Sequence, residues 1–479
     1  MFLKRINLLN KIAFVLILLV QLTSTSYSQV KSKLEGEINK VLSHEFFKSC
    51  QIAIDVYDLT SNKPLIRKNE KLLLRPASTL KLLTTTSSLF FLNDFKFSTN
   101  FYYTGEIKDS LLLGDFFIVG GLDPRFSLKD LDSVVTKIKK TGIKGIRGNI
   151  YADISAIDSL FWGSGWMWDD DPNPTSPYLS ALNINNNVIK INYEPGFLDK
   201  PALINTIPQT NFVEVINNSI TKTNVANPFS ITRDWMNRNN KILATGEISV
   251  SQKSDSVLLN IFNPTEYFLT LFKESLERNR IFFKGELKTS FLPSGIREFL
   301  VIERDLDSII VNVNKNSDNL AAEMLLCGLG LKYFGKPTSA EKGLRLIDSL
   351  IVVTGMDPKL FKVADGSGLS FYNLISAELL TNILKYIYQN NSEVFSKLFN
   401  SLPIAGIDGT LKNRMKNSPL FNNLRAKTGS LSGISTLSGY LINKSKHLVA
   451  FTIFIQNFKG SAKFARDAQD KICELIYNN

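Results

Sequence analysis

The feature of this sequence that most constrains its fold is a change of pattern between residues 95 and 294. Short aromatic and β-branched runs fill this stretch, among them FSTNFYYTGEI, LLLGDFFIVGG and EISVSQKSDSVLLNIF. Gly, Pro and Asn separate the runs, an arrangement typical of strands joined by turns. Two stretches with helical spacing, LKDLDSVVTKIKKTG and PTEYFLTLFKESLERN, interrupt them. The sequence therefore predicts a β-rich module over 95–294.

The segments on either side of this module predict mixed structure. QIAIDVYDLT and PLIRKNEKLLL alternate like paired strands, and an apolar helix is expected from Ser78 to about Leu92. Beyond residue 295, three helical stretches precede a long hairpin and a closing helix. A chain of 479 residues exceeds one typical core. We predict an α+β fold in which 29–94 and 295–479 form one domain, an antiparallel sheet flanked by helices, split by the insertion 95–294.

The first 28 residues predict a signal peptide. Three basic residues precede an apolar run over 12–22, and Ser26 and Ser28 follow in a small-x-small arrangement. The apolar run is short for a membrane span, which favours cleavage, here predicted after Ser28, and export to the periplasm. A retained N-terminal anchor is the alternative.

Charge and histidine content narrow the function. The chain has 56 Lys and Arg against 44 Asp and Glu, a formal net charge of +12. In an exported protein this balance suits cell-wall polymer or a peripheral membrane contact, or merely a solvated lysine-rich surface, and we expect no nucleic-acid partner. The two histidines, His44 and His447, are too few for a zinc hydrolase and poorly placed for a Ser-His-Asp triad. We predict no metal and no cofactor.

Ser78 and Lys81 are the candidate nucleophile and base. Their spacing places both side chains on one face of a helix, with Cβ atoms roughly 5–6 Å apart. The chain contains four Ser-x-x-Lys pairs: Ser28–Lys31, Ser78–Lys81, Ser219–Lys222 and Ser339–Lys342. The first straddles the predicted cleavage site, the third lies in a polar turn, and the fourth is predicted to cap a helix. A role of Ser78 as a simple helix cap is the alternative.

Two further motifs follow Ser78 along the chain. Ser317-Asp318-Asn319 stands at the start of a predicted helix, and Lys427-Thr428-Gly429 leads into a predicted strand. A second Lys-Thr-Gly at 140–142 ends a predicted helix, where glycine is a common stop signal. We interpret 140–142 as a helix end and 427–429 as part of a site.

The three motifs in this order resemble those of penicillin-binding proteins and class A β-lactamases. GDFFIVGGLDPRFS (114–127), ADGSGLS (364–370) and AGIDGTLKNRM (405–415) are similar to the low-molecular-mass class C penicillin-binding proteins. The resemblance covers nearly the whole mature chain, including the long insertion that a class A β-lactamase lacks. Leu122 departs from the pattern, where another small residue is expected. The resemblance implies a penicillin-binding/β-lactamase-like domain.

A serine hydroxyl needs a base to become a nucleophile, and lysine can act as that base only when neutral. Burial and a second ammonium group, for which Lys427 is the candidate, would lower the pKa of Lys81. The resemblance implies that Ser317 relays a proton and that Asn319 binds the substrate backbone. It further implies that Lys427 and Thr428 bind the terminal carboxylate, and that the N–H groups of Ser78 and Ser430 hold the oxyanion. In this scheme Asp318 and Asp365 have structural roles and take no part in catalysis.

The function implied by this resemblance is that of a D-alanyl-D-alanine carboxypeptidase, endopeptidase, or both. Such an enzyme acts on peptidoglycan peptides through a serine acyl-enzyme, and β-lactams acylate the same serine. A peptidoglycan-binding protein without turnover, or a related esterase or amidase of D-amino-acid compounds, is the alternative. The Trp-rich segment FWGSGWMWDDD is either a packed surface lid or a wall that faces a ligand. The oligomeric state is left open.

Overall fold

The computed structural model describes residues 33–479 of the chain, so the predicted signal peptide lies outside the described residues. The chain divides into two compact units. Unit 1 contains the residues up to Thr79 together with Leu374–Asn479, and unit 2 contains Leu80–Asn373. Within residues 33–479, none of the helices combines the length and apolar character that crossing a membrane requires.

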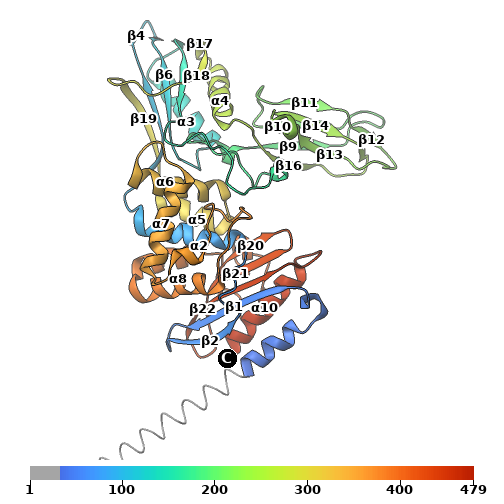
Figure 1. Ribbon diagram of the computed structural model, residues 1–479. Helices are drawn as coiled ribbons and strands as arrows, with labels where there is room; N and C mark the ends of the chain where they lie inside the picture. Colours follow the sequence, from blue (N-terminus) through green and yellow to red (C-terminus); the bar gives the residue numbers. More distant parts are fainter. Residues whose placement is uncertain (1–32) are drawn as a thin grey trace, which may run out of the picture. The chain divides into compact units, whose positions relative to one another are not determined.

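Unit 1 is built on a five-stranded antiparallel sheet of order β2-β1-β22-β21-β20 (Figure 1). Its strands are β1 (Gln51–Asp58), β2 (Lys63–Lys68), β20 (Arg425–Leu431), β21 (Ile434–Ile442) and β22 (Leu448–Gln456). The hairpin predicted near the C-terminus is confirmed as β21 and β22. β20, which carries Lys427-Thr428-Gly429, forms one edge of the sheet.

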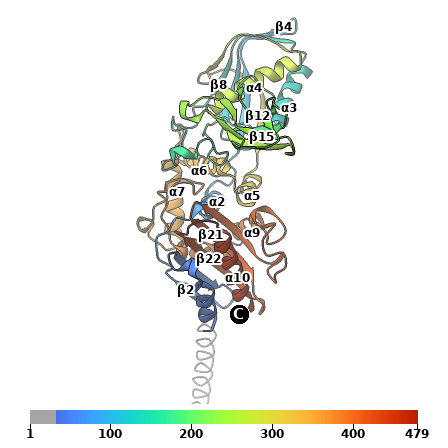
Figure 2. The ribbon, with the colours of Figure 1, turned by 90° about the vertical axis from the view of Figure 1, so that its right-hand side faces the viewer.

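Helices cover both faces of this sheet, because its strands alternate two sets of buried side chains. The helices of unit 1 are residues 33–42, α8 (Ala377–Asn390), α9 (Ser392–Ser401) and α10 (Lys463–Asn478). α10 lies against β21 (Figure 2), and its Ile472 joins the core formed by Ile54 and Phe451. On the opposite face the hydroxyl of Tyr440 donates to the carbonyl of Leu384 in α8, at 2.9 Å.

Unit 2 contains a cluster of four helices in which α2 contacts the other three (Figure 1). They are α2 (Lys81–Phe91), α5 (Leu306–Asn316), α6 (Asn319–Phe334) and α7 (Ala340–Val353). Most of α6 is buried on every side, as expected of a helix that is apolar all round. Ser339 caps α7 by accepting a hydrogen bond from the N–H of Lys342, so its predicted capping role is confirmed.

The β-rich stretch also lies inside unit 2. A five-stranded sheet of order β18-β8-β6-β3-β19 and a four-stranded sheet of order β17-β7-β5-β4 form its larger part. Their strands are β3 (Phe97–Tyr103), β4 (Glu106–Lys108), β5 (Leu111–Leu113), β6 (Phe116–Gly121), β7 (Gly145–Arg147), β8 (Ile150–Asp153), β17 (Phe282–Lys284), β18 (Leu287–Thr289) and β19 (Arg297–Arg304). The two predicted helices are present as α3 (Leu128–Lys140) and α4 (Pro264–Arg278). Phe116, Val134 and Phe272 join the sheet and both helices in one core.

Three smaller sheets, of order β10-β9-β16, β11-β14-β13 and β12-β15, complete this stretch. Their strands are β9 (Val188–Glu194), β10 (Leu203–Ile207), β11 (Glu214–Asn217), β12 (Ile220–Lys222), β13 (Ser230–Arg233), β14 (Lys241–Thr245), β15 (Glu247–Ser249) and β16 (Asp255–Asn260). α3 ends at Lys140, and Gly142 follows with a φ of +83°, so the Lys-Thr-Gly at 140–142 is a helix end, as predicted. Separate helices and mainly antiparallel sheets make the fold α+β. The domain limits at 94/95 and 294/295 stay a prediction.

Candidate active site

Lys81 begins α2 and is fully buried. Nζ donates to the side-chain oxygen of Asn319 at 2.5 Å and to the backbone carbonyl of Ser367 at 2.6 Å. These two bonds fix the position of the Nζ atom relative to Asn319 and to the loop that contains Ser367.

Burial lowers the pKa of Lys81 from 10.5 to about 8. The carboxylates of Asp365, Glu323 and Asp318 oppose this shift because they favour the charged ammonium. Burial is therefore the physical cause of the lowered pKa. The effect predicted for a second ammonium at Lys427, which belongs to unit 1, stays a prediction.

The Ser317-Asp318-Asn319 motif lies where α5 ends and α6 begins. Ser317 adopts a left-handed conformation with a φ of +58°, which turns the chain from one helix into the next. Asp318 caps α6 by accepting from the N–H of Ala321, which agrees with its predicted structural role. Asn319 bonds Lys81 through its oxygen, and its Nδ2 donates to the carbonyl of Thr175 at 2.5 Å. Ser317 and Asn319 line a pocket of about 360 Å³.

Glu323 is a site residue that the sequence reasoning missed. It lies one turn after Asn319 on α6 and is 2% exposed. Its carboxylate accepts from the N–H groups of Gly366 and Ser367, at 3.1 and 2.8 Å. Burial and the neighbouring Asp365 carboxylate raise the pKa of Glu323 to about 8. A single acid in the apolar run NLAAEMLLCGLGL was the signal that could have found it.

Asp365 holds the ADGSGLS loop in shape and connects it to the Trp-rich segment. Its carboxylate accepts from the N–H groups of Gly368 and Ser370, at 2.9 and 2.8 Å, as its predicted structural role requires. It also accepts from the indole N–H of Trp166 at 2.9 Å. Trp166 is buried, whereas Trp168 is 68% exposed. The Trp-rich segment therefore packs into the protein through Trp166 and exposes Trp168 to solvent. Both tryptophans line a pocket of about 500 Å³.

Ser78 lies in unit 1, in the 3₁₀ turn Ala77–Leu80 that precedes α2. The helix expected from Ser78 thus starts as a tighter turn. The N-cap residue of α2 is Leu80, without a side-chain capping bond, so Ser78 is not the cap of this helix. Ala77 adopts a left-handed conformation with a φ of +46°, which costs energy for a residue with a Cβ and is often found at functional sites.

Gly429 allows the Ser78 turn to lie close to the edge strand β20 within unit 1. A Cβ at Gly429 would lie 2.8 Å from the carbonyl oxygen of Pro76 and 2.9 Å from the backbone nitrogen of Ser78. It would also overlap the hydroxyl of Thr436, which donates to the same carbonyl of Pro76 at 2.7 Å. The glycine of the third motif is required by this close approach of two backbones.

The other predicted residues of β20 differ in exposure. Lys427 is buried, and its Nζ donates to the carbonyl of Thr428 at 2.9 Å. Thr428 is half-buried, and its hydroxyl donates to the hydroxyl of Thr410, in the AGIDGTLKNRM stretch, at 2.7 Å. Ser430 is exposed. Unit 1 thus brings Ser78 to the strand of Lys427, Thr428 and Ser430, and unit 2 brings Lys81 to Asn319.

Both histidines lie in unit 1, and the hydrogen bonds of their ring nitrogens involve none of the motif residues. His447 is in the turn between β21 and β22, where its Nδ1 is 2.7 Å from a carboxylate oxygen of Asp58. His44 precedes the 3₁₀ turn Glu45–Phe47. Across the described part of the chain, no three His, Cys, Asp or Glu side chains are grouped so that they could hold a metal ion.

The fold of this chain matches that of known structures. Penicillin binding protein 4 from Haemophilus influenzae shares it with a TM-score of 0.82 at 24% identity, over 92% of this chain and 99% of that chain. A second structure of that protein, complexed with a β-lactam, gives a TM-score of 0.77 at 23% identity, over 92% of this chain and 99% of that chain. The predicted penicillin-binding/β-lactamase-like fold is confirmed.

The sequence comparisons identify the family. Residues 34–478 match the D-Ala-D-Ala carboxypeptidase 3 (S13) family, so the chain belongs to this family and is a serine peptidase. The D-alanyl-D-alanine carboxypeptidase DacB of Haemophilus influenzae is 28% identical over 409 residues, 84% of each chain. A D-alanyl-D-alanine carboxypeptidase of Actinomadura is 28% identical over 459 residues, 92% of this chain and 84% of that protein. The resemblance inferred from the motifs is confirmed.

Proposed function

We propose that Ser78, with Lys81 as its general base, carries the D-alanyl-D-alanine peptidase activity of this family, and that the substrate is a peptidoglycan peptide. The observation that carries this proposal is the environment of Lys81. Its amine is buried, has a pKa of about 8, and donates to two fixed acceptors, Asn319 and Ser367. A lysine in this state can accept a proton near neutral pH, which an exposed lysine cannot.

The reaction follows from these roles in two steps. Neutral Lys81 takes the proton from the Ser78 hydroxyl while Oγ attacks the substrate carbonyl, and the N–H groups of Ser78 and Ser430 stabilise the oxyanion. Each donor of this kind commonly contributes about 3–4 kcal/mol. Collapse breaks the peptide bond, and the proton reaches the leaving amine through Ser317. Water then hydrolyses the acyl-enzyme and frees Ser78.

The remaining residues bind the substrate in this proposal. Asn319, fixed by its bonds to Lys81 and Thr175, would present its amide to the substrate backbone. Lys427 and Thr428 would bind the carboxylate at the peptide end, because an ammonium and a hydroxyl on an edge strand can both donate to it. A β-lactam would acylate Ser78 by the same attack, because its ring carbonyl takes the place of the peptide carbonyl.

We also propose that the chain is exported to the periplasm with its signal peptide cleaved after Ser28. Residues 29–94 and 295–479 would form the catalytic domain, and 95–294 the inserted module. These proposals rest on the basic and apolar pattern of the N-terminus and on the run of β-strands between Phe97 and Arg304.

Labelling with a fluorescent penicillin tests the proposal. We expect wild-type protein to be labelled and Ser78→Ala to be unlabelled. The matched control is Ser339→Ala, which changes the serine of another Ser-x-x-Lys pair and costs only a helix cap, about 1 kcal/mol of stability. Labelling that persists in a folded Ser78→Ala protein would rule out Ser78 as the nucleophile.

Product analysis separates the remaining alternatives. Release of D-alanine from a pentapeptide identifies a carboxypeptidase, and cleavage of a cross-linked muropeptide dimer identifies an endopeptidase. Binding of wall peptides without release of either product would favour the peptidoglycan-binding protein without turnover. Hydrolysis of only simple D-amino-acid esters or amides would favour the related esterase or amidase.

A further inference from the structure

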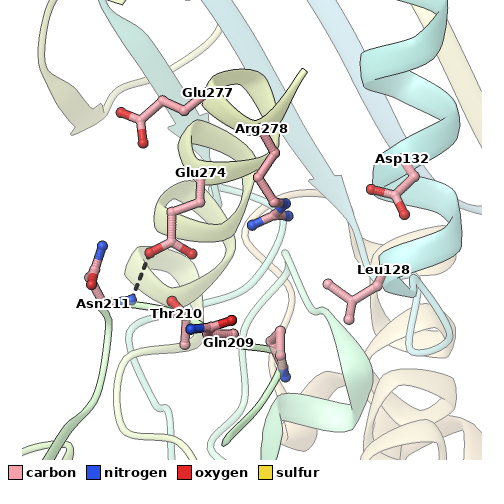
Figure 3. Close-up of a pocket in the computed structure, with 9 residues that line it drawn as sticks. Leu128, Asp132, Gln209, Thr210, Asn211, Glu274, Glu277 and Arg278 are labelled. Atoms are coloured by element: carbon pink, nitrogen blue, oxygen red, sulfur yellow. Dashed lines mark hydrogen bonds between the residues drawn. The ribbon is translucent and has the colours of Figure 1, made fainter. Parts of the chain in front are cut away.

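A second pocket in unit 2 contains none of the three motifs. It has a volume of about 580 Å³ and lies between α3, α4 and residues 208–211 (Figure 3). The segment 208–211 connects β10 to β11, so the wall of this pocket combines parts of the chain that are distant in sequence. We refer to it as the Glu274 pocket, after the residue that distinguishes it.

Glu274 is a buried acid with one satisfied and one unsatisfied oxygen. The residue is 8% exposed, and its Oε1 accepts from the backbone N–H of Asn211 at 2.7 Å. Oε2 is buried as well, yet no donor in the described part of the chain reaches it. A buried carboxylate oxygen without a donor is costly and rare in native proteins. Its position on the pocket wall points to a donor that comes from outside the chain.

The charges around Glu274 restrict what that donor can be. Asp132 of α3 and Glu277 of α4 also line the pocket, so its wall contains three carboxylates and one guanidinium, that of Arg278 (Figure 3). This acidic wall stands out in a chain with more basic than acidic residues. The carboxylates would repel a phosphate or another polyanion, and a simple cation would leave the N–H donors of Arg278 without an acceptor from the ligand. A ligand that carries both an ammonium and a carboxylate can pair with the acidic side chains and with Arg278 at the same time.

The other contacts of these side chains leave room for such a ligand. Asp132 accepts a long bond from the hydroxyl of Ser275, at 3.4 Å, and Glu277 forms a loose ion pair with Lys273, at 3.8 Å. Arg278 follows Glu274 by one helical turn, so the two groups lie on the same side of α4. Leu128 adds an apolar wall against which methylene groups could pack.

We propose that the Glu274 pocket binds the zwitterionic group of an amino acid, with the ammonium on Glu274 and Asp132 and the carboxylate on Arg278. The same chemistry is present in a free amino acid and at an unsubstituted amino-acid end within a wall peptide. The second source rests on the proposed function, whereas the first does not. The site is separate from the residues assigned to catalysis.

Calorimetric titration of the purified full chain tests the proposal. The probes are D-alanine, diaminopimelate and a stem tripeptide ending in diaminopimelate, with propylamine and propionate as half-ligands. We expect saturable binding of at least one zwitterion, and weaker binding of either half-ligand. Preference for the tripeptide identifies the wall peptide as the source, and equal binding of diaminopimelate identifies the free amino acid. No saturable binding of any zwitterion, or equal binding of propylamine, would overturn the proposal.

The titration is repeated on protein whose nucleophile has been acylated with penicillin, so that binding at the catalytic residues does not contribute. Acylation is followed separately by mass. If no acylation occurs, the proposed function fails, while the titration of unmodified protein and its variants still reports on the Glu274 pocket. If acylation occurs and abolishes all zwitterion binding, the pocket proposal fails and the proposed function stands.

Glu274→Gln is the decisive variant, because glutamine keeps the volume and an oxygen for Asn211 but loses the negative charge. We expect zwitterion binding to weaken on the order of 10-fold or more, with penicillin labelling unchanged. Arg278→Gln should weaken zwitterion binding and leave propylamine binding unaltered. Glu286→Gln, on the exposed turn between β17 and β18, is the matched control. Unchanged affinity in a folded Glu274→Gln protein would refute the assignment.

Discussion

The burial of Lys81 decides the protonation state of its amine. Burial disfavours the charged ammonium and so favours the neutral amine, which keeps a lone pair. With Asn319 and Ser367 as acceptors and a pKa of about 8, about one tenth of Lys81 is neutral at pH 7. Burial alone can thus give lysine the role that histidine has in other serine hydrolases.

A pH profile follows from this value. The pKa of Lys81 is lowered, so the fraction of neutral base grows as the pH rises through about 8 and is nearly complete above 9. We expect the rate of acylation by penicillin to rise over this range and then level off. In Lys81→Arg, where the guanidinium stays charged, the rise should vanish and the rate fall by about 100-fold or more. A wild-type rate that falls between pH 7 and pH 9 would contradict the role of Lys81.

Glu323 positions the loop that supplies one of these acceptors. Its carboxylate bonds the N–H groups of Gly366 and Ser367, and the carbonyl of Ser367 accepts from Lys81. Glu323→Leu would leave two buried N–H groups unpaired, at about 1–3 kcal/mol each. We expect a lower melting temperature together with a shifted pH profile of acylation.

The pH profile of acylation shows whether Glu323 positions Lys81 or only stabilises the fold. Glu341→Gln, on the exposed face of α7, is the matched control and should change neither measurement. If Glu323→Leu lowers the melting temperature but leaves the pH profile in place, Glu323 stabilises the fold without positioning the base.

At the scale of elements, the edge strand β20 and the turn that holds Ser78 form one structural feature. Both belong to unit 1, and Gly429 lets them approach within van der Waals distance. An edge strand has unpaired backbone groups on one side, which makes it suited to bind an extended peptide. The position of Lys-Thr-Gly on the edge of the sheet is therefore consistent with a role in substrate binding.

Gly429→Ala tests this arrangement. The added methyl would collide with Pro76, Ser78 and Thr436, so we expect loss of penicillin acylation and a stability loss of about 1–3 kcal/mol. Gly36→Ala is the matched control, because among residues 33–479 nothing beyond its chain neighbours and its own helix backbone lies within 4 Å of the Cβ position, and alanine favours the helix there. Normal acylation kinetics in Gly429→Ala would show that the close approach has no functional consequence.

At the scale of the whole molecule, the excess of basic residues has a consequence for wall binding. The formal net charge is +12, of which the predicted signal peptide contributes three positive charges. We expect Ser78→Ala protein to sediment with purified cell wall at low salt, and to be released as salt rises from about 0.05 M to about 0.5 M, because salt screens exposed charges. Wall stripped of its anionic polymer is the control. Retention that does not depend on salt would argue against a role of net charge.

The sequence by itself determined the three motifs, their order, the α+β class and the β-rich stretch, since each depends on short-range patterns or on composition. Helix ends such as Ser339 and Gly142 also followed from local rules, because their hydrogen bonds lie within a few residues. The tertiary structure alone decided the partners of each motif. Lys81 and Asn319 are 238 residues apart.

Glu323 shows the physical reason for this limit. An acid in an apolar helix is unusual, but the sequence does not show which donors its carboxylate oxygens bind. Those donors lie on a loop 43 residues further along, which reaches Glu323 only in the folded chain. The Glu274 pocket likewise combines α3, α4 and a strand connection that no local pattern joins. Residue type and spacing specify which chemistry a chain can perform. Burial and long-range packing decide the pKa of Lys81, the need for glycine at 429 and the unpaired oxygen of Glu274, because each depends on atoms brought together only by folding.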